Sequence, residues 1–280
     1  MTIQPDDIKL DYKTIREAKA MSGLRMVVGA FAIPAPWHES CKNIYYVKGL
    51  EYTMVRSANE DASDLELGMN GTQSELIEWT AQPSAPVVIW NDERPRSLWN
   101  DQLILAERLS PEPRLIPENT EDRIRMFGLA NELLGENGLL YNKRHFMVGP
   151  QIETLPEDSP MRGLFAALGK KYGYSEAALA SASDRVVGVL NSFDAQLAAQ
   201  HAAGKRYLIG DQLSALDIYW ASACGFLDPM PEDRCPMYSD FRTPLLYGCP
   251  NADIEKALTG ALREHRDFIY EEHLRLPMVF

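Results

Sequence analysis

The stretch SPEPRLIPEN, residues 110–119, constrains the fold of this chain more than any other feature. Pro111, Pro113 and Pro117 each lack a backbone N–H and disfavour a helical residue before them, so a helix that reaches this stretch must end there. Apolar runs and helical patterns alternate before the stretch, whereas strand-like runs almost disappear after it. We therefore predict an α/β domain followed by an all-helical domain, joined by a linker at 111–119.

The first half has the pattern of a βαβ unit followed by a further strand and helix. Short apolar runs between turn residues predict strands, and apolar spacing of three and four residues predicts helices. The predicted strands are 24–32, 51–56 and 85–90, and the predicted helices are 38–49 and 98–109. The α/β domain is thus placed at 23–110, after an N-terminal extension at 1–22 of unknown use.

The second half, residues 120–280, is predicted to be a helical bundle. Apolar residues recur at helical spacing over five segments, as on helices that bury one face. These segments are 120–138, 160–172, 174–201, 214–227 and 251–274. Val186, Leu190, Phe193 and Leu197 form one such apolar stripe.

Composition disfavours several function classes. The formal net charge of −12 is unfavourable for a nucleic-acid backbone or an anionic membrane surface, because both attract basic patches. No apolar run approaches the roughly 18 residues of a membrane span, and the N-terminus lacks the pattern of a secretion signal. We expect a cytoplasmic protein with neither nucleic acid nor membrane as a partner.

The four cysteines do not predict a disulfide framework or a metal site. Cys41, Cys224, Cys235 and Cys249 include no CxxC pair and no spacing typical of metal ligands. We expect free thiols and no bound metal.

The stretch YLIGDQLSALDIYWASACGFL, residues 207–227, contains the clearest local motif. Ser214 lies three residues before Asp217 and directly before an apolar run, which is the spacing of a capping box at a helix start. Leu213 and Ile218 can pack as a hydrophobic staple around this cap. The motif predicts a structural role for Ser214 and Asp217, at the start of a buried central helix.

Together with the α/β half, this motif resembles the core helix of cytosolic glutathione transferases, which carry the pattern GDxLTxADI at this place. The resemblance covers residues 24–275 and implies a thioredoxin-like, glutathione-binding domain at 23–110 and a helical domain at 120–280. The segment SAPVVIW looks like the family's cis-proline strand, which implies a cis peptide bond before Pro86. Family resemblance also implies a homodimer.

The resemblance implies a glutathione site on the α/β domain. In the family, the backbone of the residue before the cis-proline pairs with the cysteinyl part of glutathione, and Ala85 takes this place here. The acid and hydroxyl that hold the γ-glutamyl end fall on Asp101 and Gln102, at the start of a helix whose amides and dipole favour a carboxylate. The alternative for Asp101 is an acid at a helix start that faces water.

The stretch APWHESCKNIYYVKGLE runs without a gap against the CPWAHR…KGLE pattern of the omega and xi classes of glutathione transferases. Pro36 and Trp37 match, and the catalytic cysteine of those classes falls on Ala35. Because alanine has no thiol, a mixed disulfide with glutathione cannot form at this position. Reduction by the omega or xi route is therefore disfavoured.

Residues near this helix start are candidates for stabilising a cofactor thiolate. His38 and Ser40 are the candidate catalytic donors, with a surface histidine and a helix-cap serine as the alternatives. Trp37 either lines the ligand cleft or fills the domain interface. Cys41, one turn into the helix, is expected to pack against the sheet.

Tyr141 and His145, in the segment LLYNKRHFMV, fall in the region that faces the second-substrate pocket of the family, although core packing explains them equally well. The resemblance implies a transferase of alkyl or aryl groups with a role in detoxification. It would bind glutathione and promote thiolate attack on an apolar or aromatic substrate that is electrophilic or ether-linked. Two alternatives stay open. One is a non-catalytic carrier or protein-binding module, and the other is a protein that keeps the fold but uses His38 with another thiol or none.

Overall fold

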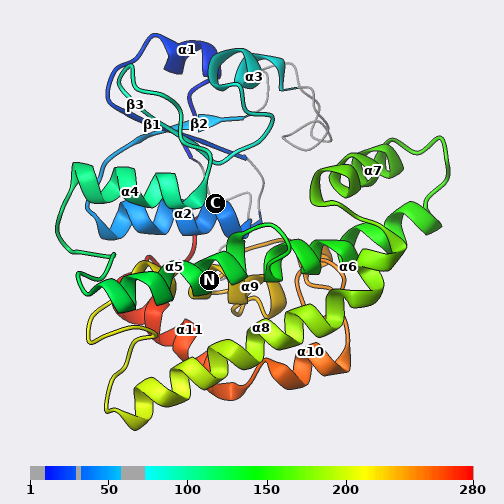
Figure 1. The fold of residues 1–280 in the computed structure, drawn as a ribbon. Coiled ribbons are helices and arrows are strands. Elements are labelled where there is room, and N and C mark those ends of the chain that lie inside the picture. Colours follow the sequence, from blue (N-terminus) through cyan, green and yellow to red (C-terminus); the bar gives the residue numbers. More distant parts are fainter. Residues whose placement is uncertain (1–9, 30–32, 58–72, 280) are drawn as a thin grey trace.

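The computed structural model describes residues 10–29, 33–57 and 73–279, and these form a small α/β region above a larger helical region (Figure 1). The elements are, in chain order, α1 (Ile15–Lys19), β1 (Leu24–Val28), α2 (Pro36–Val47), β2 (Thr53–Arg56), α3 (Ser74–Thr80), β3 (Val87–Trp90), α4 (Trp99–Leu109), α5 (Thr120–Leu134), α6 (Leu139–Thr154), α7 (Pro160–Tyr172), α8 (Glu176–Ala202), α9 (Ala215–Leu227), a 3-10 turn (Ser239–Phe241), α10 (Ala252–Ala257) and α11 (Gly260–His273). The predicted α/β plus all-α class is confirmed.

The described strands form one sheet in the order β2-β1-β3. β1 pairs parallel with β2 and antiparallel with β3. An isolated bridge between Val88 and Arg96 extends the outer edge of β3. All five residues of β1 are buried, as expected for the central strand of a sheet that is covered on both faces.

Alternation along β1 divides the core of the α/β region in two. Met26 and Val28 pack in the large core that includes α2 and α4, whereas Val27 packs with Ile15 of α1 and Leu76 of α3. Figure 1 shows the same division, with α1 and α3 on one side of the sheet and α2 and α4 on the other. Helix α2, which covers the second of these faces together with α4, also packs against α9 of the helical region.

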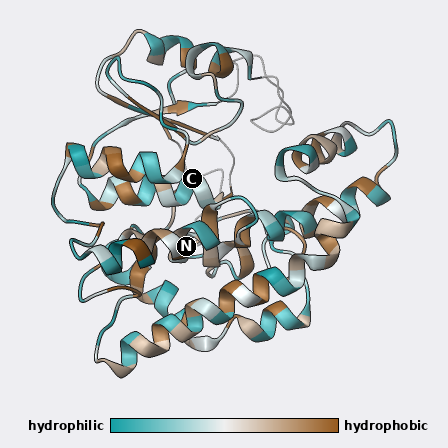
Figure 2. Ribbon diagram, in the orientation of Figure 1, coloured by the Kyte–Doolittle hydropathy of each residue, from teal (hydrophilic) through white to brown (hydrophobic). Residues whose placement is uncertain are grey.

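The helix α9 is the centre of the helical region. Every residue of α9 except Gly225 is buried, and α5, α11 and α2 all pack against it. Figure 2 shows apolar residues concentrated on the strands and on the inward faces of the helices, with polar residues outside. Within the part of the chain that the structure describes, no helix is both long enough and apolar enough to cross a bilayer.

Helices α6 and α7 form a projection beside this centre (Figure 1). They have a small apolar cluster of their own, which includes Val148, Phe165 and Leu168. Trp37 of α2 packs against the same cluster. The projection therefore meets the start of α2, and this places α7 beside the α/β region.

Candidate functional site

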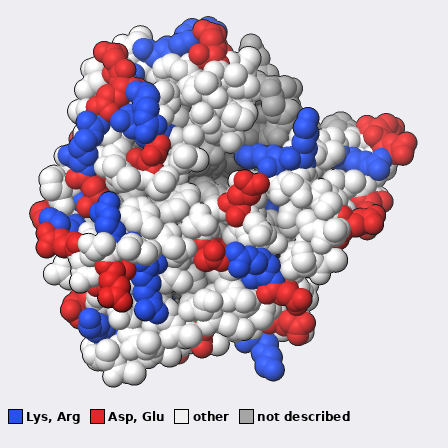
Figure 3. All heavy atoms as spheres, in the orientation of Figure 1, with Lys and Arg blue, Asp and Glu red and all other residues white. Residues whose placement is uncertain are grey.

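A cleft of about 520 Å³ lies between the α/β region and helices α5, α6 and α7. Its lining comes from six places in the chain: Trp37, residues 82–86, residues 97–100, residues 131–136, Tyr141, and Lys171 with Tyr172. Figure 3 shows a hollow between the α/β region and α7, with basic side chains on the α7 side. The cleft thus brings together the predicted residues Trp37, Ala85, Pro86 and Tyr141.

The cleft continues into a smaller hollow of about 50 Å³, here called the inner end. Ala35, His38 and Arg144 line the inner end, and Lys171 and Tyr172 line both spaces. The N-terminus of α2 therefore opens onto the inner end. Ala35 is its N-cap residue and supplies no side-chain hydrogen bond to the helix amides.

The floor of the cleft is set by the segment before β3. The bond between Ala85 and Pro86 is cis, as the family resemblance implies. Gln102 is buried, and its Nε2 donates to the carbonyl oxygens of Pro86 (3.0 Å) and Arg96 (3.3 Å). The amide nitrogen of Gln102 therefore ties α4 to both sides of β3, and this geometry gives no support to its expected ligand contact.

Asp101 differs from its predicted role as well. Its carboxylate accepts a hydrogen bond from Arg94 at 2.9 Å, and it does not line the cleft. The first turn of α4 still faces the cleft, through Ser97, Leu98 and Asn100. Leu98 is the N-cap and makes no side-chain cap, so the start of α4 presents amides rather than an acid to the cleft.

Trp37 joins the two halves of the molecule and also lines the cleft. Its Nε1 donates to the carbonyl oxygen of Leu134 at 3.1 Å. Its ring stacks on Tyr172, with centroids 5.9 Å apart and planes 20° apart, and meets the edge of Tyr141 at 5.9 Å. Both alternatives for Trp37 therefore apply, because an interface residue here is also a wall of the cleft.

His38 lies at the inner end, where its imidazole is hydrogen-bonded to the backbone of Ala85. Burial lowers the pKa of His38 to about 3, and the positive charges of Lys42, Lys171 and Arg144 act in the same direction. The side chain is therefore neutral at neutral pH. It can act as a hydrogen-bonding group but not as a cation.

Ser40 does not reach the cleft. It is 2% exposed, and its Oγ donates to the carbonyl oxygen of Pro36 at 2.8 Å, one turn earlier in α2. A serine inside a helix commonly makes this bond to the carbonyl four residues before it. The geometry does not support the expectation that Ser40 is a thiolate donor.

No cysteine lines the cleft. Cys41 is 2% exposed in the core beneath α2, and burial raises the pKa of its thiol. Burial also raises the pKa of Cys224, Cys235 and Cys249, each to about 12. All four thiols are free, so a nucleophilic sulfur in this cleft would have to come from a ligand.

The structure places Tyr141 of α6 in the lining of the cleft, whereas the position of His145 fits the core-packing alternative. His145 is buried, lies beside Tyr174 with ring centroids 6.1 Å apart, and does not line either space. Arg144, three positions after Tyr141 on the same helix, lines the inner end, whereas Tyr141 lines the main cleft. Arg144 was not among the predicted site residues, and the helical spacing from Tyr141 is the signal that could have indicated it.

Arg144 is held by aromatic rings rather than by an acid. Its guanidinium carbon lies 4.7 Å from the ring centroid of Phe226, 5.6 Å from that of Tyr172 and 5.9 Å from that of Trp37. Distances of this size are typical of cation–π contacts. Among the residues that the structure describes, no carboxylate forms an ion pair with Arg144 or with Lys171.

The capping box of Ser214 and Asp217 is present at the start of α9, far from this chemistry. The Asp217 carboxylate accepts from the backbone nitrogen of Ser214 at 2.9 Å and from its hydroxyl at 2.7 Å. It also accepts from the backbone nitrogen of Leu208 at 2.8 Å, and Nε2 of His265 lies 2.9 Å away. The sequence did not predict these last two partners, because they come from distant segments.

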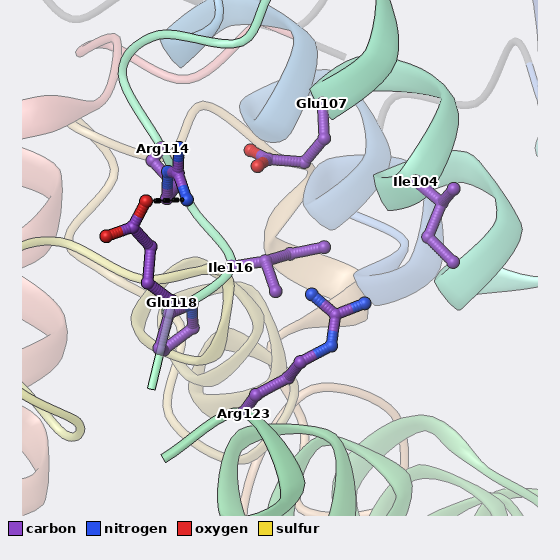
Figure 4. A pocket seen from close by; sticks show the side chains of 7 residues that line it. Ile104, Glu107, Arg114, Ile116, Glu118 and Arg123 are labelled. Atoms are coloured by element: carbon purple, nitrogen blue, oxygen red, sulfur yellow. Dashed lines mark ion pairs between the residues drawn. The ribbon is translucent and has the colours of Figure 1, made fainter. Parts of the chain in front are cut away.

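A second hollow, of about 450 Å³, lies between α4, the linker and α5 (Figure 4). Arg114 and Glu118 pair across its mouth, and Glu107 is already bound by Lys48 at 2.6 Å. Arg123 lies over the ring of Phe127. None of the predicted site residues lines this hollow. In the described ranges, no group of three histidine, cysteine or acidic side chains could hold a metal ion.

Comparison with known proteins gives similar structures but no similar sequences. No protein-family model and no curated protein matches the chain. A glutathione S-transferase from Methylobacterium radiotolerans, crystallised with glutathione sulfonate, is similar with a TM-score of 0.55 at 14% identity, covering 89% of this chain and 91% of the other. The beta-etherase LigF from Sphingobium sp. strain SYK-6 has a TM-score of 0.54 at 15% identity, covering 88% and 99%. The nitrogen regulation fragment of the yeast prion protein Ure2p has a TM-score of 0.51 at 12% identity, covering 92% and 99%. At such identities, what these proteins share with the chain is the arrangement of helices and strands.

Proposed function

Because this chain adopts the glutathione transferase fold, as its sequence predicted, we propose that it binds glutathione in the cleft and promotes attack of that thiolate on an apolar electrophilic or ether-linked substrate. One structural neighbour was crystallised with glutathione sulfonate, which supports the proposed glutathione binding. Another is a beta-etherase, which supports the proposed attack on an ether-linked substrate. The volume of the cleft, about 520 Å³, lies in the usual range for small-molecule sites.

Two features of the cleft suit a tripeptide with a thiol. The backbone of Ala85 at the floor offers an extended segment for the cysteinyl part, and Gln102 fixes this floor by its bond to the Pro86 carbonyl. The start of α4, at Ser97 and Asn100, offers backbone amides to a carboxylate. Asp101 and Gln102 are no longer proposed as direct contacts.

The observation that carries the proposal is that the inner end of the cleft is electropositive and that none of the four cysteines of the chain lines it. The start of α2 and the side chains of Arg144 and Lys171 meet at the inner end, where each favours a negative charge. Bound glutathione supplies the sulfur nucleophile. The sulfur forms a bond to the electrophilic carbon as the bond from that carbon to the leaving group or ether oxygen breaks, and the departing group takes the electron pair and then a proton from water. The chain itself contributes position and electrostatic stabilisation.

A non-catalytic carrier is the second candidate, and two observations favour it. His38 already uses the backbone of Ala85, and the Asp101 carboxylate is already paired with Arg94. Both groups would have to exchange partners to serve a ligand. A protein that binds glutathione or an apolar guest without turnover would fit these contacts.

The proposal is tested by placing a charge at the start of α2. Asp and Asn are both good helix N-caps, so Ala35→Asp and Ala35→Asn should each fold at least as well as the parent protein. Only the aspartate repels a thiolate, and we expect its kcat/KM with glutathione and an aryl halide or aryl ether to be about tenfold or more below that of the asparagine variant. Equal kcat/KM values for the two variants would contradict the proposed site.

Calorimetry separates the two candidates. Glutathione binding by the parent protein with turnover of an aryl electrophile supports the transferase, whereas binding without turnover of any electrophile tested supports the carrier. An absence of binding at millimolar glutathione would reject the transferase and would leave only a carrier of an apolar guest.

We also propose that the chain forms a homodimer. Ile104 of α4 and Ile124 of α5 are 47% and 68% exposed, and their helices are neighbours through the rings of Trp99 and Phe127, 6.0 Å apart. Sedimentation analysis should give a dimer for the parent protein and a shift toward monomer for Ile124→Glu. A monomer at tens of micromolar parent protein would contradict this.

A further inference from the structure

Among the residues that the structure describes, the inner end of the cleft has two cations and no anion. Arg144 and Lys171 come from different helices, α6 and α7, and both line this space. No acidic residue is among the described side chains that line the inner end. The Nε atom of Arg144 is buried and has no hydrogen-bond partner among the described residues. Other arginines that the structure describes pair with an acid, for example Arg185 with Glu132 and Arg234 with Glu271, whereas Arg144 is among the described arginines that form no ion pair.

The aromatic rings around Arg144 hold its charge in place without neutralising it. A ring face attracts a cation without accepting its N–H groups. Arg144 Nη1 donates to Sδ of Met147 at 3.3 Å, and the remaining guanidinium donors can meet a carboxylate. Lys171 lies over the ring of Tyr172 in a similar way, with its nitrogen 5.1 Å from the centroid. The two side chains are therefore positioned by Trp37, Tyr172 and Phe226 and keep their capacity to bind an anion.

The sizes of the two connected spaces indicate the shape of a ligand. The inner end, about 50 Å³, has room for a few water molecules, or for a carboxylate, but not for an aromatic ring. The main cleft, about 520 Å³, has room for a ring beside Trp37, Tyr141 and Tyr172. Aromatic walls of this kind bind flat rings by stacking and edge contacts.

Charge sets the orientation of such a ligand. Glu136 lines the main cleft but not the inner end, so an anionic group is favoured inward and disfavoured along the outer wall. His38 and Tyr172 are the other titratable side chains among the described residues that line the inner end, and the imidazole of His38 is neutral and adds no charge.

We infer that the cleft takes an aromatic carboxylate, with its ring beside Trp37, Tyr141 and Tyr172 and its carboxylate at Arg144 and Lys171. This inference goes beyond the proposed function: at about 50 Å³ the inner end cannot hold this carboxylate and a glutathione thiolate together, so the aryl acid is a ligand that competes with glutathione and not its second substrate. The ligand binds to the protein alone, and glutathione is not needed for that step.

The test compares two probes that differ only in charge. Naphthalene-2-carboxylate and naphthalene-2-carboxamide have nearly the same shape, and their dissociation constants are measured by calorimetry at neutral pH without glutathione. We expect the parent protein to bind the carboxylate about tenfold or more tightly than the carboxamide, since hydrogen bonds to charged groups are among the stronger ones. Similar affinity for the two probes, or no binding of either at millimolar concentration, would overturn the inference.

Matched variants locate the effect. Arg144→Gln and Lys171→Gln should each reduce the preference for the carboxylate several-fold, and Arg144→Lys should retain part of it because the charge stays. Lys170→Gln is the control, since Lys170 is exposed on the same helix and does not line either space. A circular-dichroism melt of each variant shows that it is folded. Loss of the preference in Lys170→Gln, or its full retention in Arg144→Gln, would overturn the inference.

A last arm separates this inference from the proposed function. Because the two ligands share the inner end, saturating glutathione should displace the naphthoate. Naphthoate that stays bound at saturating glutathione would place it outside the inner end, which would reject the inference and keep the proposed function. Naphthoate binding that depends on Arg144 in a protein that does not bind glutathione would keep the inference as a binding site and reject the proposed function.

Discussion

The start of α9, which is buried, and the inner end of the cleft, where Lys171 is exposed, are both polar clusters, and they are built in opposite ways. At the start of α9, the fully buried carboxylate of Asp217 has four partners within 2.9 Å. At the inner end, Arg144 and Lys171 have no acid among the described residues, and His38 is kept neutral. Complete pairing is what a stable fold needs, whereas unpaired charges are tolerated where a ligand completes them.

The largest expected effect is at Asp217. Asp217→Ala leaves the buried amides of Leu208 and Ser214 without an acceptor and removes the partner of His265. We expect the free energy of unfolding to fall by about 3 to 5 kcal/mol, measured by urea denaturation. The control is Asp211→Ala, because Asp211 is exposed and 3.5 Å from Lys205, and it should change stability by less than about 0.5 kcal/mol. Similar results for the two variants would mean that the Asp217 cluster is not structural.

A smaller effect is expected from acid at His38. The unfolded imidazole takes up a proton near pH 6.5, whereas the folded one stays neutral to about pH 3, so protonation favours the unfolded chain. Stability therefore falls as the pH drops from 6.5 toward 3. We expect the parent protein to lose about 1 to 2 kcal/mol more than His38→Gln between pH 6.5 and 4.5, allowing for partial solvent screening. The control is His201→Gln, an exposed position on α8 that should follow the parent protein. Parallel curves for the parent protein and His38→Gln would show that the inner end does not disfavour positive charge.

A direct probe of the charge at the inner end is a thiol at its N-cap. In Ala35→Cys, the start of α2 and the nearby cations should lower the pKa of the new thiol by about one unit or more below the usual 8.5. The four native thiols all have raised pKa values, so thiolate absorbance between pH 5 and 9 reports the new one. Ala198→Cys, on the exposed side of α8, should titrate near the usual value. If both new thiols titrate alike, the inner end is not an electropositive site.

The fold could be predicted well from the sequence because its signals are local. The prolines at 111–119, the apolar periodicity of the helical half and the cap at Ser214 each act over a few residues, and the α/β plus all-α class follows from them. Some elements were missed, including the 16-residue helix α6, which lies between the predicted segments 120–138 and 160–172. Helix α3 has only seven residues, and the predicted segment 251–274 is two helices, α10 and α11, separated at Leu258 and Thr259.

The site could be predicted only in part, because the partners of its side chains come from distant segments. Ala85, Pro86, Trp37 and Tyr141 do meet in one cleft. A polar side chain is available to that cleft only if it has no hydrogen-bond partner elsewhere in the fold. Gln102 already donates to the Pro86 carbonyl. Lys171 reaches the cleft because α7 is carried beside the α/β region by α6, and no local pattern in the sequence indicates that placement.

The central claim is that the inner end of the cleft, which is electropositive and has no cysteine, lowers the pKa of a thiol that a ligand brings. The most direct measurement is the thiol pKa of glutathione bound to the parent protein, followed by thiolate absorbance across pH at saturating protein. We predict a value at least about one unit below that of free glutathione in the same buffer. An unchanged value, or no binding at millimolar glutathione, would contradict the account.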